Sequence, residues 1–320
     1  MHQVSPLPPP STTPPPPHLA RFMYFCSMNP KGKLVIIGGA VDKGSFTEQH
    51  FDEKVEKNLN FFETGILKRI LTESRHQSDS RIEIITTASK IPREVGPEYA
   101  KAYAYLGAKN VGVMHIEKRE STDLSENLQR LSEADVVMFT GGDQLRLSSI
   151  LGGTQFHDLL LEKYRGEDFI YAGTSAGAAA ASTHMIYQGS SHEALCKGEV
   201  KITSGLGLID EIIVDTHFVQ RGRIGRLFQA VVSNPRILGV GLGEDTGLLI
   251  TQGKTMEAIG SGLVILVDGR HIKDTNLTEV ELGQPISIKN LVVHVMSMYD
   301  LYDLKTHSMS IHNTLQTYEA

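Results

Sequence analysis

The chain has 320 residues, of which 40% are hydrophobic and 21% charged, and its formal net charge is −6 at pH 7. This composition is typical of a soluble globular protein, and the acidic balance argues against general affinity for nucleic acid. No stretch approaches the run of about 18 apolar residues that spans a membrane. The two cysteines lack the spacing of a zinc site, so we expect no metal centre. So few cysteines also indicate a reducing compartment, and we therefore expect a cytoplasmic protein.

The first 30 residues differ from the rest because they are rich in proline. Eight of the 13 prolines lie before His18. A run of this kind forms neither a helix nor an interior strand, so we expect residues 1–30 to be a disordered leader. No linker is visible in residues 31–320, and we expect them to form a single catalytic α/β domain.

From residue 31 onward, apolar runs alternate with stretches of helical spacing. Apolar runs typical of buried strands lie at 33–37, 82–86, 111–114, 135–139 and 169–172. Helical stretches lie between them at 97–106, where Pro97 suits a helix start, and at 125–131 and 154–164. A strand at 212–214, a helix at 224–232 and closing strands at 238–242, 247–250 and 262–267 continue the pattern. This alternation predicts a doubly wound α/β fold, with a mostly parallel sheet and helices on both faces.

Residues 173–177 fit the pattern G-x-S-x-G around Ser175. They follow an apolar strand and precede the small residues Ala178–Ala181, which is the strand–turn–helix context of a nucleophile elbow. In such a turn the serine Oγ rises out of the sheet, and the N–H of Ala176 points to where an oxyanion forms. A glycine-rich connection with an idle serine is the alternative, and the context favours the nucleophile.

A serine hydroxyl needs a base, and the chain has 13 histidines. His217 is the favoured candidate because it follows the predicted strand at 212–214. If that strand lies in the same sheet as the strand before Ser175, both carboxyl ends face the same crevice.

Three arginines, Arg221, Arg223 and Arg226, gather near the start of the predicted helix at 224–232. The helix dipole disfavours cations there by about 0.3–1 kcal/mol each, and a local violation of this kind often marks a functional site. Arginine suits bidentate binding of carboxylates. Asp215 can pair with one of the arginines or bind a cationic group of the substrate, and three solvated arginines are the alternative.

Gly141 and Gly142 follow the strand at 135–139 and allow close approach of the backbone to a ligand. Gly142 can supply a second oxyanion donor, and Gln144 can donate a hydrogen bond to substrate. A simple turn capped by Asp143 is the alternative.

Four motifs in this order, at residues 37–40, 140–144, 173–177 and 215–226, resemble the cyanophycinases of the peptidase E-like serine peptidases. The resemblance covers about residues 31–300. It implies the three-layer sandwich of the class I glutamine amidotransferases, commonly as a homodimer. It also implies an exopeptidase, without metal or cofactor, that trims cyanophycin to β-Asp-Arg dipeptides. Cyanophycin is a poly-aspartate with arginine joined to each β-carboxyl.

The resemblance also implies roles for individual residues. Ser175 is the nucleophile, His217 the general base and Glu193 the carboxylate that orients the imidazole, although spacing alone leaves Glu199 and Glu211 open. The positions that match substrate-gripping residues of the family are Gln144, Asp215, Thr216, Arg221, Arg223 and Arg226. Two positions depart from the family pattern, namely Thr216, where glutamine is common, and Val41, where an acidic residue is often found.

Three other functions remain open at this point. The first is a dipeptidase of the same family that acts on aspartyl or isoaspartyl peptides, and the second is a non-catalytic binder with the same fold. The third is an α/β-hydrolase esterase, which also uses G-x-S-x-G and needs a histidine near the C-terminus, where His294, His307 and His312 are available.

Overall fold

A computed structural model of the chain describes residues 29–44, 61–191 and 193–312. Residues 1–28 of the predicted proline-rich leader lie outside the described residues.

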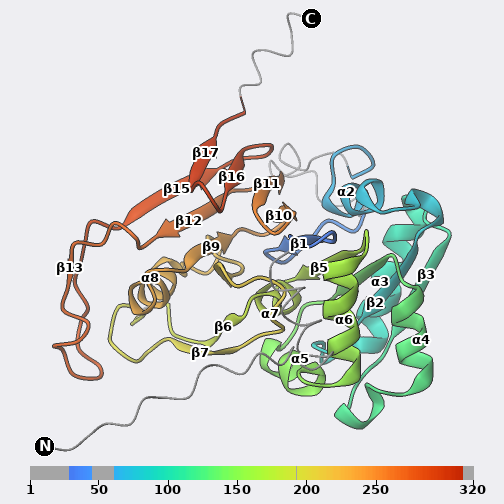
Figure 1. The fold of residues 1–320 in the computed structure, drawn as a ribbon, viewed down its shortest axis with the longest axis horizontal. Helices are drawn as coiled ribbons and strands as arrows, with labels where there is room; N and C mark the ends of the chain where they lie inside the picture. The colour runs from blue at the N-terminus through green and yellow to red at the C-terminus, as the bar shows by residue number, and fades with distance from the viewer. Residues whose placement is uncertain (1–28, 45–60, 192, 313–320) are drawn as a thin grey trace, which may run out of the picture.

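A nine-stranded sheet forms the centre of the molecule (Figure 1). Its parallel half contains, in spatial order, β1 (Lys33–Ile37), β5 (Ile170–Thr174), β4 (Val136–Phe139), β2 (Arg81–Ile85) and β3 (Asn110–Met114). Beyond β1 the sheet continues antiparallel with β10 (Thr246–Thr251), β11 (Thr255–Gly260), β16 (Leu301–Asp303) and β17 (Ser308–Ser310). The carboxyl ends of five neighbouring strands therefore meet at one edge.

Helices cover both faces of the parallel half. One core joins Val35 and Ile37 of β1 to α2 (Ile66–Glu73) and α3 (Pro92–Tyr105). The other core joins Leu34 and Ile36 to the helices of the opposite face, which are α4 (Ser125–Glu133), α5 (Gln144–Leu151), α6 (Gln155–Gly166) and α7 (Ala176–Ala181). Because alternate residues of a strand point to opposite faces, a continuously apolar strand needs cover on both sides. The predicted α/β fold is confirmed.

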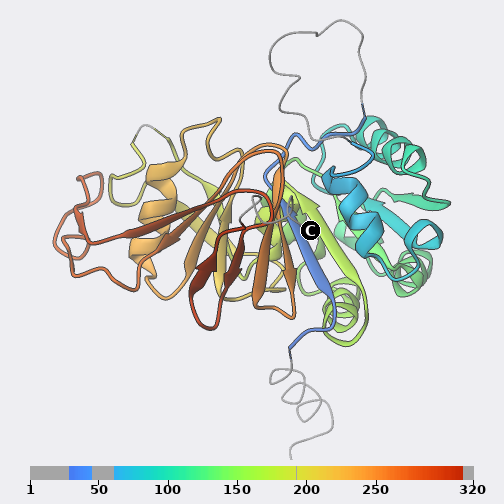
Figure 2. The same ribbon diagram turned by 90° about the horizontal axis from the view of Figure 1, so that it is seen from above.

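A second, four-stranded sheet contains the strand that leads to His217. Its order is β15 (Val292–Met296), β12 (Val264–Asp268), β9 (Leu238–Leu242) and β8 (Ile212–Asp215), and β8 and β9 are parallel. α8 (Ile224–Ser233) packs on it through Leu227 and Val231. Figure 2 shows α8 on the opposite side of the molecule from α2. The strand at 212–214 thus belongs to a different sheet from β5, and the predicted closing strands are divided between the two sheets.

Two short antiparallel ladders complete the described strands. They pair β6 (His184–Gln188) with β7 (Lys201–Ser204), and β13 (Asp274–Thr275) with β14 (Ile288–Lys289).

The helix predicted at 97–106 begins earlier than expected. α3 starts at Pro92, and Pro97 lies inside it at an exposed position. Both prolines suit a first turn, where the missing N–H has no helical partner. Pro92 takes that place, and Pro97 leaves the carbonyl of Arg93 without its helical donor.

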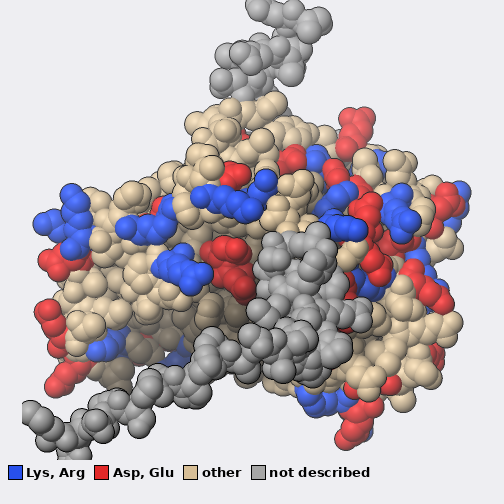
Figure 3. Space-filling view, viewed as in Figure 1, with Lys and Arg blue, Asp and Glu red and all other residues tan. Residues whose placement is uncertain are grey.

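The surface mixes both signs of charge. On the face shown in Figure 3, Lys and Arg alternate with Asp and Glu, and neither sign dominates. Within the described ranges, every helix is too short or too polar to cross a membrane.

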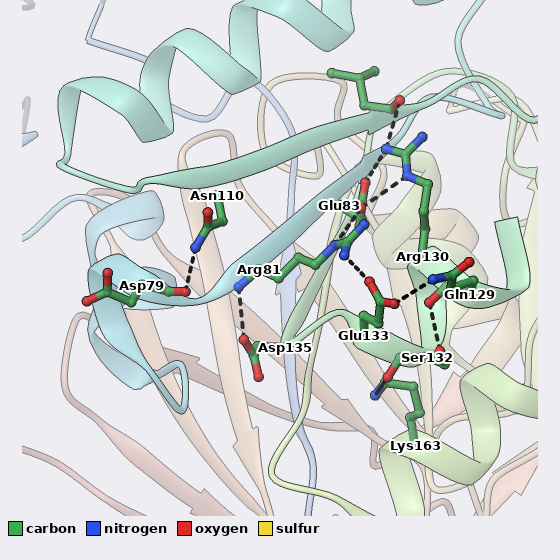
Figure 4. A network of polar contacts seen from close by, with 11 residues as sticks. Asp79, Arg81, Glu83, Asn110, Gln129, Arg130, Ser132, Glu133, Asp135 and Lys163 are labelled. Carbon is green, nitrogen blue, oxygen red and sulfur yellow. Dashed lines mark hydrogen bonds and ion pairs between the residues drawn. The ribbon is translucent and has the colours of Figure 1, made fainter. Parts of the chain in front are cut away.

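A buried carboxylate ties α4 to the sheet (Figure 4). Glu83 of β2 is 1% exposed. Its Oε1 accepts hydrogen bonds from Nε of Arg81, at 3.1 Å, and from Nε of Arg130, at 3.2 Å. Arg130 lies in α4 and also donates to the carbonyl of Val113 in β3, at 3.1 Å. The pair of Glu83 and Arg130 therefore links α4 to β2 and β3.

We expect Glu83→Ala to lower the free energy of unfolding by about 3–5 kcal/mol, because it leaves Arg130 without its buried partner. Glu133→Ala is the matched control, since Glu133 pairs with Arg81 at a half-exposed position, and its effect should stay below about 1 kcal/mol. Urea unfolding of both variants measures the difference. Equal losses would contradict the role given to Glu83.

Candidate active site

Ser175 lies in the tight turn between β5 and α7. Its backbone has φ 49° and ψ −104°, a strained conformation for a residue other than glycine. The Ser175 N–H donates to the carbonyl of Ile37 in β1, at 2.8 Å. Small neighbours are required, because a Cβ on Gly177 would lie 2.7 Å from the carbonyl oxygen of Phe139. The predicted strand–turn–helix context is therefore present, with the serine at its sharpest point.

His217 faces this serine from the second sheet. Its Nε2 lies 3.1 Å from Oγ of Ser175. The His217 N–H donates to the carbonyl of Gly38, at 2.8 Å, and the residue has φ 48°. The ends of β8 and β1 thus meet although they belong to different sheets. His217 is the histidine that the structure brings to Ser175.

Glu244 lies on the other side of the imidazole. Its Oε1 is 2.6 Å from Nδ1 of His217, and its N–H donates to Oε1 of Gln220, at 3.2 Å. A carboxylate at this position favours a proton on Nδ1, which leaves Nε2 free to accept a proton from the serine. The hydroxyl, the imidazole and the carboxylate form one hydrogen-bonded line.

The structure places Glu244, and not Glu193, beside His217. Glu193 is exposed, and its backbone contacts Ser190 and Cys196. Both ring nitrogens of His217 already face other side chains, so Glu193 has no place at the ring. The sequence did carry a signal for Glu244, because this residue closely follows the apolar strand at 238–242, and β9 is the parallel neighbour of β8.

Gly39 makes room for the imidazole. It has φ +116°, and a Cβ at this position would lie 2.3 Å from Cε1 of His217. Asp245 holds the surrounding loop, because its N–H donates to the carbonyl of Gly39 at 2.8 Å and its Oδ1 accepts the N–H of Asp42 at 3.0 Å. Burial raises the pKa of the Asp245 carboxyl. The loop after β1 is thus bound to the residue that follows Glu244.

The glycine loop after β4 runs beside the serine. A Cβ on Gly141 would lie 4.0 Å from Oγ of Ser175, and one on Gly142 would overlap the carbonyl oxygen of Ala88, at 2.0 Å. Asp143 caps α5 by accepting the N–H of Leu145, at 2.9 Å. The helix cap by Asp143 is therefore present, and the glycines pack closely against the protein's own backbone. Gly142 and Ala176, the first residue of α7, remain the predicted oxyanion donors.

Asp215 and Arg226 form a buried pair beside this site. Both guanidinium-to-carboxylate distances are 2.6 Å, and the side chains are 1% and 7% exposed. The remaining nitrogen of Arg226, Nη1, donates to the carbonyl of Gly189, at 3.3 Å. All three nitrogens of Arg226 are thus engaged within the protein. In this structure Asp215 and Arg226 are bonded to each other and to the backbone, and their predicted contact with substrate stays a prediction.

The other predicted substrate residues differ in how far they are exposed. Arg223 donates to the carbonyl of Thr216, at 2.7 Å, and burial lowers the pKa of its guanidinium. The buried Thr216 donates its N–H to Asp215. The half-buried Gln144 donates to the carbonyl of Ile186, at 3.0 Å. Arg221 is exposed and forms no ion pair with any described residue.

No three His, Cys, Asp or Glu side chains gather closely enough to hold a metal ion in the part of the chain that the structure describes. The hydrogen-bonded line of Ser175, His217 and Glu244 is an arrangement that supports nucleophilic attack by a serine with an imidazole base.

We expect Gly39→Ala to slow the reaction of Ser175 with a fluorophosphonate probe by about 100-fold, because the new methyl group displaces His217. Gly107→Ala is the matched control. Gly107 also has a positive φ, at +90°, but no atom lies within 4 Å of its added Cβ. Both variants carry a similar backbone cost, so only Gly39→Ala should be labelled more slowly by the probe. Equal labelling rates would show that Gly39 does not govern the position of the imidazole.

Comparison with known proteins identifies the family of the chain. The model of peptidase family S51 matches residues 59–258. Cyanophycinase of Trichormus variabilis is 37% identical over 227 residues, which are 71% of this chain and 76% of that protein. Cyanophycinase of Geminocystis herdmanii is 35% identical over 72% of this chain and 85% of its own length. The crystal structure of a peptidase from an acI-B1 Actinobacterium has the same fold, with a TM-score of 0.55 and 19% identity over 84% of this chain and 99% of that chain. The chain therefore belongs to peptidase family S51 and is a serine-type peptidase.

Proposed function

We propose that this peptidase is an exopeptidase that hydrolyses cyanophycin and releases β-Asp-Arg dipeptides. The observation that carries the proposal is the hydrogen-bonded line from Ser175 through His217 to Glu244. The curated relatives named cyanophycinase support the choice of substrate.

The reaction follows from the positions of these groups. Nε2 of His217 takes the proton of Ser175 as Oγ attacks the scissile carbonyl carbon. Glu244 stabilises the imidazolium that forms, and the N–H groups of Ala176 and Gly142 stabilise the oxyanion. The imidazolium then protonates the leaving amine. Water, activated by the same imidazole, hydrolyses the acyl-enzyme and restores the serine.

The substrate carries free carboxylates, and Arg221 is the arginine best placed to bind one of them. Its backbone N–H donates to the carbonyl of His217, at 3.0 Å, so it lies close to the base. Arg223 and Arg226 instead hold Asp215 and the backbone of Thr216, which precedes His217. The homodimer and the cytoplasmic location stay predictions.

We expect Glu244→Gln to lower kcat by about 10²–10⁴, because an amide at Nδ1 neither fixes the tautomer nor stabilises the imidazolium. Glu193→Gln is the matched control and should keep kcat within about twofold, since Glu193 has no contact with His217. Mass analysis of the soluble products from purified cyanophycin measures both, with Ser175→Ala as the inactive reference. A larger loss in Glu193→Gln than in Glu244→Gln would reverse the assignment.

This experiment also tests the substrate. Release of β-Asp-Arg by the wild-type protein supports the proposal. Cleavage of free aspartyl or isoaspartyl dipeptides without release from the polymer would contradict it, and would instead assign the dipeptidase function.

We expect Arg221→Ala to raise KM for cyanophycin by about 3–10-fold with kcat unchanged, because it removes a substrate contact that is the same in the ground state and the transition state. Arg236→Ala is the control, since Arg236 is also exposed but follows α8 at the far end of the helix from Arg221. Steady-state kinetics on soluble cyanophycin fragments measure both. An unchanged KM in Arg221→Ala would remove this arginine from the binding site.

A further inference from the structure

A second hollow lies on the carboxyl edge of the parallel strands. It is a pocket of about 540 Å³ lined by Ser89, Lys90, Pro92, Glu117, Asp143 and Arg146. These residues come from the segments that follow β2, β3 and β4. β4 pairs with β5, which ends directly before Ser175. The pocket and the nucleophile therefore open at the same edge of the sheet.

The glycine loop after β4, with Gly141 and Gly142, lies between the pocket and Ser175. Gly141 approaches Ser175 on one side, and Gly142 packs against the backbone of Ala88 on the other. The N–H of Asp143 donates to the carbonyl of Ala88, at 2.9 Å. A substrate chain bound at Ser175 that follows this edge past the loop therefore runs toward the pocket.

Arg146 presents a fixed positive charge in the pocket. Its Nε donates to the carbonyl of Thr87 and its Nη2 to the carbonyl of Glu117, both at 2.9 Å. Both acceptors are neutral, so they hold the guanidinium in place without cancelling its charge. Among the described residues, Arg146 forms no ion pair, and neither does the exposed Lys90. Two cations are thus available to an anionic ligand.

The same pocket carries acidic groups. Glu117 is exposed and forms no ion pair within the described ranges. Asp143 uses Oδ1 for the cap of α5, and no described residue donates a hydrogen bond to its Oδ2. A ligand that pairs with both the basic and the acidic side chains of this pocket carries both a carboxylate and a cationic group.

We infer that this pocket binds one β-Asp-Arg unit of the cyanophycin chain, beyond the two units that flank the scissile bond. The inference rests on the proposed function. Each unit has a free carboxylate, which suits Arg146 and Lys90, and a guanidinium, which suits Glu117 and Asp143. The volume lies in the range of about 300–1,000 Å³ that small-ligand sites occupy.

The consequence is a dependence on substrate length. A long chain fills the pocket and gains binding energy there, whereas a peptide of two units occupies only the positions around the scissile bond. Because the pocket is remote from the reacting atoms, its contacts change KM and leave kcat unchanged.

The test compares Lys90→Glu with the wild-type protein on two substrates, the two-unit peptide (β-Asp-Arg)₂ and soluble cyanophycin fragments of at least about six units. Lys90 is exposed and makes no bond to a described residue, so the substitution leaves folding intact. We expect KM for the long substrate to rise by about 3–10-fold and KM for (β-Asp-Arg)₂ to stay unchanged. Lys273→Glu, an equal charge reversal at an exposed lysine near the second sheet, is the control and should alter neither value.

A second measurement separates binding from turnover. Co-sedimentation of Ser175→Ala with insoluble cyanophycin should fall when Lys90→Glu is added, and should not fall with Lys273→Glu. An equal rise in KM for both substrate lengths, or no change in either measurement, would overturn the inference while the proposed function stands. If the wild-type protein releases β-Asp-Arg from neither substrate, the proposed function fails, and the inference fails with it.

Discussion

The hydrogen bond from the His217 N–H to the carbonyl of Gly38, at 2.8 Å, joins two sheets at the point where the active site forms. Within the second sheet, the N–H of the next residue, Phe218, donates to the carbonyl of Leu242 in β9, at 3.0 Å. The proposed nucleophile follows a strand of one sheet, and the proposed base and its carboxylate follow strands of the other. If these contacts were lost, Ser175 would keep its strained turn but would have no imidazole in reach. The proposed mechanism therefore depends on the packing between the two sheets as much as on the three side chains.

The backbone near this junction is strained at several positions. Ser175, His217, Asp245 and Ala40 all have φ between 44° and 49°. Each such residue costs about 1–3 kcal/mol and persists only where the surrounding structure holds it. Here the strands before the first three are fully buried, and their cores are continuous with the helices on both faces. The stability of the core thus maintains a geometry that the loops alone would not adopt.

The arginine cluster places cations at a helix N-terminus, where the helix dipole disfavours them, and does so without strain. Arg223 and Arg226 sit at the unfavourable end of α8, but the buried Asp215 pairs with both. A buried carboxylate with two guanidinium partners needs no further counter-ion, so these arginines shape the turn that carries His217. Only Arg221 has its charge exposed to a ligand. Two of the three arginines at this helix N-terminus are therefore paired within the protein, and the binding of substrate by the cluster stays a prediction.

The sequence by itself determined most of the elements, the elbow around Ser175 and the choice of His217, because these depend on apolar periodicity and on small residues at a sharp turn. The prediction that Pro97 begins α3 was wrong, since Pro92 also suits a first turn and the helix begins there. Only the tertiary structure showed that β8 lies outside the main sheet, that Glu244 stands behind the imidazole, and that a charged pocket lies along the same edge. Strand pairing and the meeting of loops depend on contacts between distant segments. A sequence pattern does not indicate which distant segment of the chain a given strand or loop will contact in the folded protein.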